Sequence, residues 1–461
     1  MLIECWSDCR HAEGSIEHEL SPVPLSIAKV GGEMRTTQKA ELLHILSKSI
    51  CIEHRVPLPM SGHAQSWSCL NPSSRKKPSG SQTFGQYAEV FLLSVLQHFG
   101  NHTTRVDVVF DHYLGQGSIK SATRSRRLGK KQPIRRLIDG PEIPLPQVWN
   151  QFIGLSENKA ELARFLSEKD RDLPEQYDLV TGGGFESQND ARSNRREHLN
   201  IRGNHEEADT RMVLHALDAV NMGFERVLVH SQDTDVFLIL MHFLSHVETW
   251  MVAGTAKSRK CYPIQAIAQT LPKSIKVNLL SFHALMGCDT TSSFSGQGKK
   301  SCWKIFQNHP NLVSGVGRDG QFQDAKRFVC LLYGTPDAAT IDHSRLEIFS
   351  RAKKGLDQLP PTRDALELHV APANHQATIW LQTDKENMSI APPTESSAWK
   401  NAPTGLEIVW SRLPPVPQAC LELLICGCKN GCVTIRCTCY KIGLLRPLIF
   451  SNRITVRKIT G

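Results

Sequence analysis

The 461-residue sequence has no long hydrophobic segment. Its longest apolar run, 236–244, contains His242 and is well short of the roughly 20 residues that a transmembrane helix requires. The N-terminus lacks the basic segment followed by an apolar core that marks a secretory signal. These absences argue against a membrane or secreted protein and predict a reducing, intracellular location.

Two further absences narrow the function. We find no internal repeat, which argues against a solenoid or propeller. The glycine turn at 292–301 is no nucleotide-binding P-loop, because Ser293 and Lys300 occupy the positions where that motif requires Gly and Ser or Thr. What is present is the composition of an ordinary globular protein, with 40% hydrophobic and 21% charged residues. The formal net charge of +9 favours polyanionic partners.

Local patterns predict four parts: an N-terminal helical and irregular region with a linker, an α/β domain, a Pro-rich linker and a Cys-rich segment. Their predicted boundaries are 1–83, 84–350, 351–416 and 417–461. The first part is predicted to contain a short amphipathic helix at 38–52 and a polar linker at 72–82.

Helices and strands are predicted to alternate through the second part. The expected helices are 84–99, 158–167, 206–221 and 236–246, and the expected strands are 106–110, 226–230 and 249–253. A glycine-rich loop is expected at 182–195. Such alternation predicts an α/β fold, a parallel sheet with helices on its faces.

Five acidic residues lie at predicted strand ends or helix starts, and a sixth lies shortly before a pair of glycines. The five are Asp111, Glu207, Asp209, Asp233 and Asp235, and the sixth is Asp289. The carboxyl ends of parallel strands open a crevice at one edge of a sheet. Hard divalent cations such as Mg²⁺ or Mn²⁺ prefer carboxylate oxygens, and two such ions can promote displacement at a phosphodiester. The acids therefore form a candidate metal site.

Each of these acids, taken singly, also has a structural explanation, which is favoured over a catalytic one. Glu207 fits a capping box with Asn204, and Asp209 complements the helix dipole. On a regular helix these two acids point to different sides. Asp233 and Asp235 are harder to explain in this way, because they follow a buried strand, where charge is costly. A functional role is favoured for this last pair.

In their order, these motifs resemble the flap-endonuclease and XPG-like nucleases, which have a PIN-like fold. The matching segments are Val-Val-Phe-Asp111, Glu207-Ala-Asp209, Ser-Gln-Asp233-Thr-Asp235, and Gly-Cys-Asp289 followed by Gly296-Gln-Gly298-Lys299. The resemblance implies a PIN-like parallel sheet and a structure-specific endonuclease or exonuclease dependent on Mg²⁺ or Mn²⁺. It implies that the six acids bind the metals and are catalytic.

The same resemblance implies that the glycine turn with Gly296, Gly298, Lys299 and Lys300 binds the duplex backbone. One element of the nuclease pattern is absent, a first strand with an Asp. From 50 to 100 the only acids are Glu53 and Glu89, and the segment 60–70, where this strand is expected, lacks a continuous β-branched core. Either the first ligand comes from elsewhere or the site is degenerate.

The chain also resembles a group of uncharacterised, transposon-associated animal proteins. The shared segments are His-Glu-Leu-Ser-Pro-Val-Pro-Leu at 18–25, Asn-His-Glu-Glu-Ala-Asp-Thr-Arg at 204–211 and Phe-His-Ala-Leu-Met-Gly-Cys-Asp at 282–289. The resemblance covers most of 18–305 and implies a transposon-derived origin.

A basic stretch at 120–136 contains eight Lys or Arg residues and no acid: Lys120, Arg124, Arg126, Arg127, Lys130, Lys131, Arg135 and Arg136. These residues could neutralise phosphates, and in the nuclease family a basic arch follows the same strand. A solvated loop and a nuclear localisation signal remain open alternatives.

Six of the 14 cysteines crowd near the C-terminus: Cys420, Cys426, Cys428, Cys432, Cys437 and Cys439. So dense a set of thiolates favours tetrahedral zinc with shared sulfurs. The array resembles the first half of a tesmin/TSO1-like CXC domain, a zinc-binding DNA-contact module. No cysteine follows Cys439, so the module is partial.

Together these features predict a nuclear protein that binds DNA, with RNA as the alternative, through a divergent metal-dependent nuclease-like domain. The alternative is a catalytically inactive DNA-binding module of a domesticated or decaying transposon-derived protein.

Overall fold

The computed structural model describes a large part of the chain. The described residues are 16–48, 50, 63–68, 80–97, 103–112, 119, 134–169, 178–187, 189–196, 201–255, 258–318, 322–351, 354–396, 398–402 and 405–417. The six C-terminal cysteines lie outside them, and so do Lys120, Arg124, Arg126, Arg127, Lys130 and Lys131 of the basic stretch.

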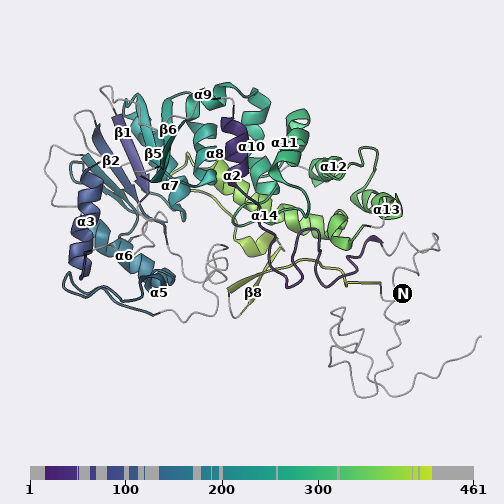
Figure 1. Ribbon diagram of the computed structural model, residues 1–461, viewed down its shortest axis with the longest axis horizontal. Coiled ribbons are helices and arrows are strands. Elements are labelled where there is room, and N and C mark those ends of the chain that lie inside the picture. The colour runs from purple at the N-terminus through teal and green to yellow at the C-terminus, as the bar shows by residue number, and fades with distance from the viewer. Residues whose placement is uncertain are drawn as a thin grey trace, which may run out of the picture.

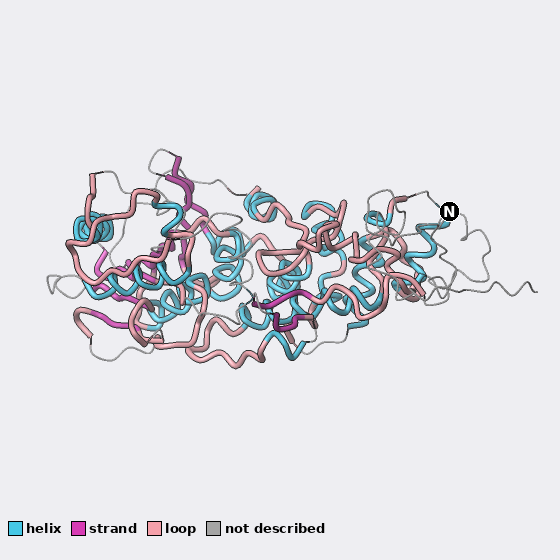
Figure 2. The backbone as a smooth tube through the Cα atoms, turned by 90° about the horizontal axis from the view of Figure 1, so that it is seen from below, coloured by secondary structure: helices cyan, strands magenta, loops and turns pink. Residues whose placement is uncertain are grey.

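A seven-stranded sheet lies at one end of the elongated molecule (Figures 1 and 2). Its order is β4-β3-β2-β1-β5-β6-β7. The strands are β1 His63–Ser68, β2 Thr103–Val109, β3 Asp178–Gly182, β4 Ala191–Ser193, β5 Arg226–His230, β6 Glu248–Thr255 and β7 Ser258–Pro263.

The sheet is mixed rather than wholly parallel. Strands β3, β2, β1, β5 and β6 run parallel to one another, whereas the two edge strands, β4 and β7, pair antiparallel with β3 and β6. The carboxyl ends of the five parallel strands therefore lie along one edge of the sheet, as the sequence predicts for the site.

Helices cover both faces of β2. Val106 and Val108 pack with α3 Phe84–Leu96, α5 Trp149–Phe152 and α6 Ser156–Lys169. Val109, one residue further on, belongs instead to the core formed with α7 Ala208–Asn221 and α8 Thr234–Phe243. Adjacent strand residues point to opposite faces, so the two cores lie on opposite sides of the sheet.

The rest of the molecule is mainly helical. It contains α9 Ile264–Gln269, α10 Lys273–Leu285, α11 Lys299–Asn308, α12 Phe322–Leu332, α13 Ile341–Arg351 and α14 Arg363–Leu381, three short 3₁₀ helices at Pro310–Val313, Leu356–Gln358 and Pro393–Ser396, and a hairpin of β8 Trp399–Ala402 and β9 Gly405–Ile408. The N-terminal helix α2, Ala40–Ser47, packs against α8 and α11 (Figure 1). No helix in the described ranges is both long and apolar enough to cross a membrane.

The interval predicted as a Pro-rich linker, 351–416, contains the 19-residue helix α14. Leu366, Ala373, Ala377 and Trp380 of this helix are buried in the same core as α7 and α8. The prolines at 360–361 precede α14 and those at 392–393 follow it. Proline is tolerated at such positions, outside a helix or at its first turn. This part is a packed piece of the fold and not a linker.

Candidate metal centre

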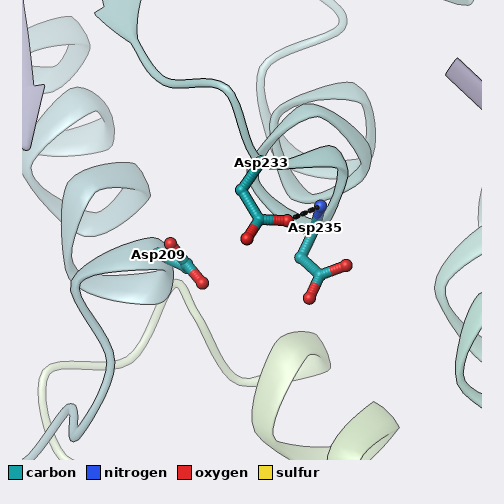
Figure 3. A group of neighbouring side chains, drawn as sticks. All are labelled: Asp209, Asp233 and Asp235. Carbon is teal, nitrogen blue, oxygen red and sulfur yellow. Dashed lines mark hydrogen bonds between the residues drawn. The ribbon is translucent and has the colours of Figure 1, made fainter. Parts of the chain in front are cut away.

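Three carboxylates from two helix starts meet beside the carboxyl edge of the sheet (Figure 3). Asp209 lies in the first turn of α7, Asp233 is the N-cap of α8, and Asp235 lies in the first turn of α8. One oxygen atom from each lies within 4.8 Å of the other two. We call Asp209, Asp233 and Asp235 the carboxylate triad. Three carboxylate oxygens so placed are suited to a hard divalent cation.

The chain positions the triad through simple local geometry. Strand β5 ends at His230, and the turn that follows is held by hydrogen bonds from the Asp233 N–H to Ser231 Oγ (3.1 Å) and from the Asp235 N–H to Asp233 Oδ1 (2.9 Å). Helix α7 runs back along the sheet before β5, so its first turn reaches the same edge. Helix N-termini favour negative charge, which offsets part of the repulsion within the triad.

Two buried hydrogen bonds in series, from Lys299 to His283 and from His283 to Asp235, orient the Asp235 carboxylate. His283 Nε2 lies 2.8 Å from Asp235 Oδ1, and Lys299 Nζ lies 3.1 Å from His283 Nδ1. An ammonium can only donate, so Nδ1 accepts and Nε2 donates its hydrogen to Asp235. Burial, together with the Lys299 charge, lowers the pKa of His283 to about 4, which keeps the imidazole neutral.

A lysine that the sequence analysis did not single out enters the cluster. Lys39 Nζ lies 2.8 Å from Asp235 Oδ2, 3.0 Å from Asp289 Oδ1 and 3.8 Å from Asp233 Oδ1. It stands at the start of α2 and is 196 residues from Asp235 in the chain. No local pattern signals such a contact, since it depends on how α2 docks.

The electrostatics differ between the neighbouring acids. Burial raises the pKa of Asp235, but the Lys39 charge and the His283 hydrogen bond outweigh it, so the pKa is well below its usual value. The pKa of Asp233 is raised by burial and by the charge of Asp235. Burial lowers the pKa of Lys39, yet its three carboxylate neighbours raise it more strongly, so the ammonium stays charged.

Asp111 and Glu207 stand outside the triad. Asp111 Oδ1 accepts a hydrogen bond from the Ala208 N–H (2.8 Å), so it caps α7 from the end of β2. Glu207 occupies the N-cap position, is buried, and makes no capping hydrogen bond with its side chain. The capping box predicted with Asn204 is wrong, because the Asn204 amide instead bonds the backbone of Met388 at 2.9 and 2.7 Å. A non-local contact thus replaces the predicted local one.

The central strand β1 lies between β2 and β5, within the segment where the sequence predicts the first strand of the nuclease pattern. Its sequence, His-Ala-Gln-Ser-Trp-Ser, contains no acid. Asp289 comes after α10 and joins the cluster through Lys39. Within the described ranges, no further group of three His, Cys, Asp or Glu residues lies close enough to hold a metal ion.

The glycine turn differs in part from its predicted role. Lys299 is buried, and its ammonium donates to His283 Nδ1 and to the Gly287 carbonyl (2.9 Å), so it is not available to a phosphate. Gly296, Gly298 and Lys300 are exposed. Gly298 caps α11, and Gly296 has a φ of 70°, which favours glycine.

At the end of the basic stretch, Arg135 contacts Glu161 Oε2 (3.3 Å) and Asn158 Oδ1 (3.1 Å) on α6. The Arg136 N–H also donates to Asn158 Oδ1 (3.0 Å). These contacts hold Arg135 and Arg136, at the end of the basic stretch, against α6.

Comparisons with known proteins assign no family to the chain. No family model matches the chain, and no curated protein matches it. Among solved structures, the chain resembles the T5 D15 protein, which was co-crystallised with metal ions, at 11% identity and a TM-score of 0.32, over 70% of this chain and 97% of that one. So weak a likeness establishes neither fold nor function.

Proposed function

We propose that the protein binds a divalent cation at the carboxylate triad and is a nuclease-like protein directed at the phosphodiester backbone of nucleic acid. The observation that carries the proposal is the convergence of Asp209, Asp233 and Asp235 within 4.8 Å. Their place at the carboxyl edge of a parallel set of strands, the order of the motifs and the net charge of +9 support it.

The donor set fits Mg²⁺ or Mn²⁺ better than a soft metal, because the triad offers carboxylate oxygens and no sulfur. A bound ion supplies Lewis acidity and lowers the pKa of water. Asp209, Asp233 and Asp235 would hold it, and His283 would keep Asp235 in position. Asp111, through its cap on α7, would position Asp209 rather than bind metal itself.

A second candidate function is a catalytically inactive module that binds nucleic acid and retains the fold. Two observations favour it: β1 brings no acid to the sheet edge, and Lys39 already neutralises part of the cluster. Zinc binding by the C-terminal cysteines, DNA contact by the basic stretch and nuclear location stay predictions from the sequence.

The deciding experiment is cleavage of labelled single-stranded, flap and duplex DNA in Mn²⁺ by the full-length protein. We expect cleavage by the wild type and its loss in the double variant Asp233→Asn, Asp235→Asn. Glu407→Gln is the matched control, because this exposed acid lies on β9, away from the triad.

Three outcomes separate the candidates. Cleavage that is lost only in the double variant supports the metal-dependent nuclease. Binding of DNA without cleavage supports the inactive module. Cleavage that survives in the double variant, or no Mn²⁺ binding by the wild type, overturns the proposed site.

A further inference from the structure

The proposed function does not use Lys39, which lies within the acidic cluster. Its ammonium lies 2.8 Å from Asp235 Oδ2 and 3.0 Å from Asp289 Oδ1. The side chain is mostly buried, with 17% of its surface exposed. The helix that begins at Ala40 fixes this placement, because Leu42, Leu43 and Leu46 are buried in the main core.

The position of Lys39 Nζ excludes an ion between Asp235 and Asp289. An Mg²⁺ ion bound to both oxygens would lie about 2.1 Å from each. Nζ already occupies the space between the same two oxygens, so ion and ammonium would be closer than two cations tolerate. The triad differs, because Lys39 Nζ is 3.8 Å from Asp233 Oδ1, compared with 2.8 Å from Asp235 Oδ2.

Asp235 can bind the Lys39 ammonium and a divalent metal ion at the same time. Its Oδ1 accepts from His283 and its Oδ2 pairs with Lys39. An ionised carboxylate has about four lone-pair sites, so each oxygen keeps one for a metal ion. Asp289 is outside the triad and forms an ion pair with Lys39.

We propose that Lys39 takes the place of a second metal ion, so that the centre holds one divalent cation at the triad while the ammonium neutralises Asp289 and shares Asp235. The inference rests on the proposed function and specifies the number of metal ions. Lys39 would also present a fixed positive charge beside the single ion.

The first test counts Mn²⁺ ions in the full-length protein by equilibrium dialysis and by electron paramagnetic resonance. The wild type is expected to bind one ion at the cluster, with no spin coupling between neighbouring ions. Lys39→Gln removes the charge and should admit a second, spin-coupled ion. Lys39→Arg keeps the charge and should bind one, and Lys400→Gln, an exposed lysine on β8, is the surface control.

Two coupled ions in the wild type, or one ion in a folded Lys39→Gln variant, would overturn the inference and leave the proposed function standing. No ion in the wild type would remove the proposed function itself. The two failures are therefore distinguishable.

A second test does not depend on how Lys39→Gln folds. Asp209→Asn removes a ligand of the single ion and should weaken Mn²⁺ binding by roughly 10- to 100-fold or more, the range that losses near a metal produce. Asp289→Asn removes one of the carboxylate partners of Lys39 and should change Mn²⁺ affinity by less than about 3-fold, well under that range. Equal losses in the two variants would contradict the inference, since Asp289 would then be a ligand.

Discussion

At the scale of single residues, a buried ion network links β2 to α7. Arg105 forms two hydrogen bonds with Asp107, Nε to Oδ2 and Nη2 to Oδ1, each 2.8 Å. His215 Nδ1 contacts Asp107 Oδ1 at 2.8 Å, and Arg105 Nη1 lies 2.7 Å from Asp218. Arg105, Asp107 and His215 are buried almost completely. Such a network is costly to break, because the remaining charge stays buried.

We therefore predict that Asp107→Asn destabilises the protein by about 3–5 kcal/mol. The variant leaves the buried Arg105 guanidinium without its two-point partner, although Asp218 still contacts one nitrogen. Urea unfolding at pH 7 measures the change. Asp218→Asn is the control and should cost less, because the Asp218 side chain is 16% exposed and contacts one nitrogen only. A loss below about 1 kcal/mol for Asp107→Asn would show that the network is not needed.

The same residue scale explains what the sequence could not predict about the site. Asp233 and Asp235 were recognisable because charge directly after a buried strand demands a reason. Lys39 was not, since an isolated lysine at the start of a short helix has no distinguishing pattern and its partners are distant in the chain. The metal role of Asp111 stays a prediction from its position after a strand, and in the structure its Oδ1 accepts a hydrogen bond from the Ala208 N–H at the start of α7.

At the scale of elements, the end of β3 packs tightly against α7. A Cβ on Gly182 would lie 2.4 Å from His215 Nε2 and 2.6 Å from His215 Cε1. His215 cannot move away freely, because its other nitrogen is bound to Asp107. A glycine here lets α7 approach the sheet closely. This helix places Asp209 in the triad.

Gly182→Ala should accordingly destabilise the protein by about 1–3 kcal/mol, the usual cost of overpacking. Thermal unfolding measures it. Gly298→Ala is the matched control, since a Cβ there meets no atom within 4 Å and the backbone needs no positive φ. Equal stability of the two variants would mean that the β3–α7 contact relaxes without cost.

Elements with strong local patterns were predicted well, and elements formed by context were not. The strands expected at 226–230 and 249–253 appear as β5 and β6 because their apolar residues suit a buried sheet. β1 has no such run, and its backbone is extended because it pairs with β2 on one side and β5 on the other. α14 was missed because the prolines around it resemble those of a linker.

At the scale of the whole molecule, buried histidines couple stability to pH. Burial lowers the pKa of His205, His283 and His369 to about 4 in each case, from an ordinary value of 6.5. Between these two pH values the unfolded chain binds protons that the folded protein does not. Stability therefore falls as the pH drops from 6.5 towards 4, and the loss is complete below about 4.

The contribution of His369 to this pH dependence of stability can be measured separately. It lies on α14, is buried, and contacts the Leu285 carbonyl through Nε2 at 3.0 Å. His369→Gln keeps a hydrogen-bond donor and removes the titrating group. The free energy of unfolding of the wild type should therefore fall more steeply than that of the variant between pH 6.5 and 4.5, by up to about 1.4 kcal/mol per pH unit.

The comparison at pH 7 supplies the control for this prediction. There the histidine is neutral in the folded protein, so any difference between wild type and variant measures packing and the hydrogen bond alone. As the pH falls, that difference should shrink, because only the wild type loses stability by protonating His369 in the unfolded chain. If the free energies of unfolding of wild type and variant ran parallel across the whole pH range, His369 would take up its proton within the folded structure. The packing of α14 against α10 would then accommodate the charged imidazole.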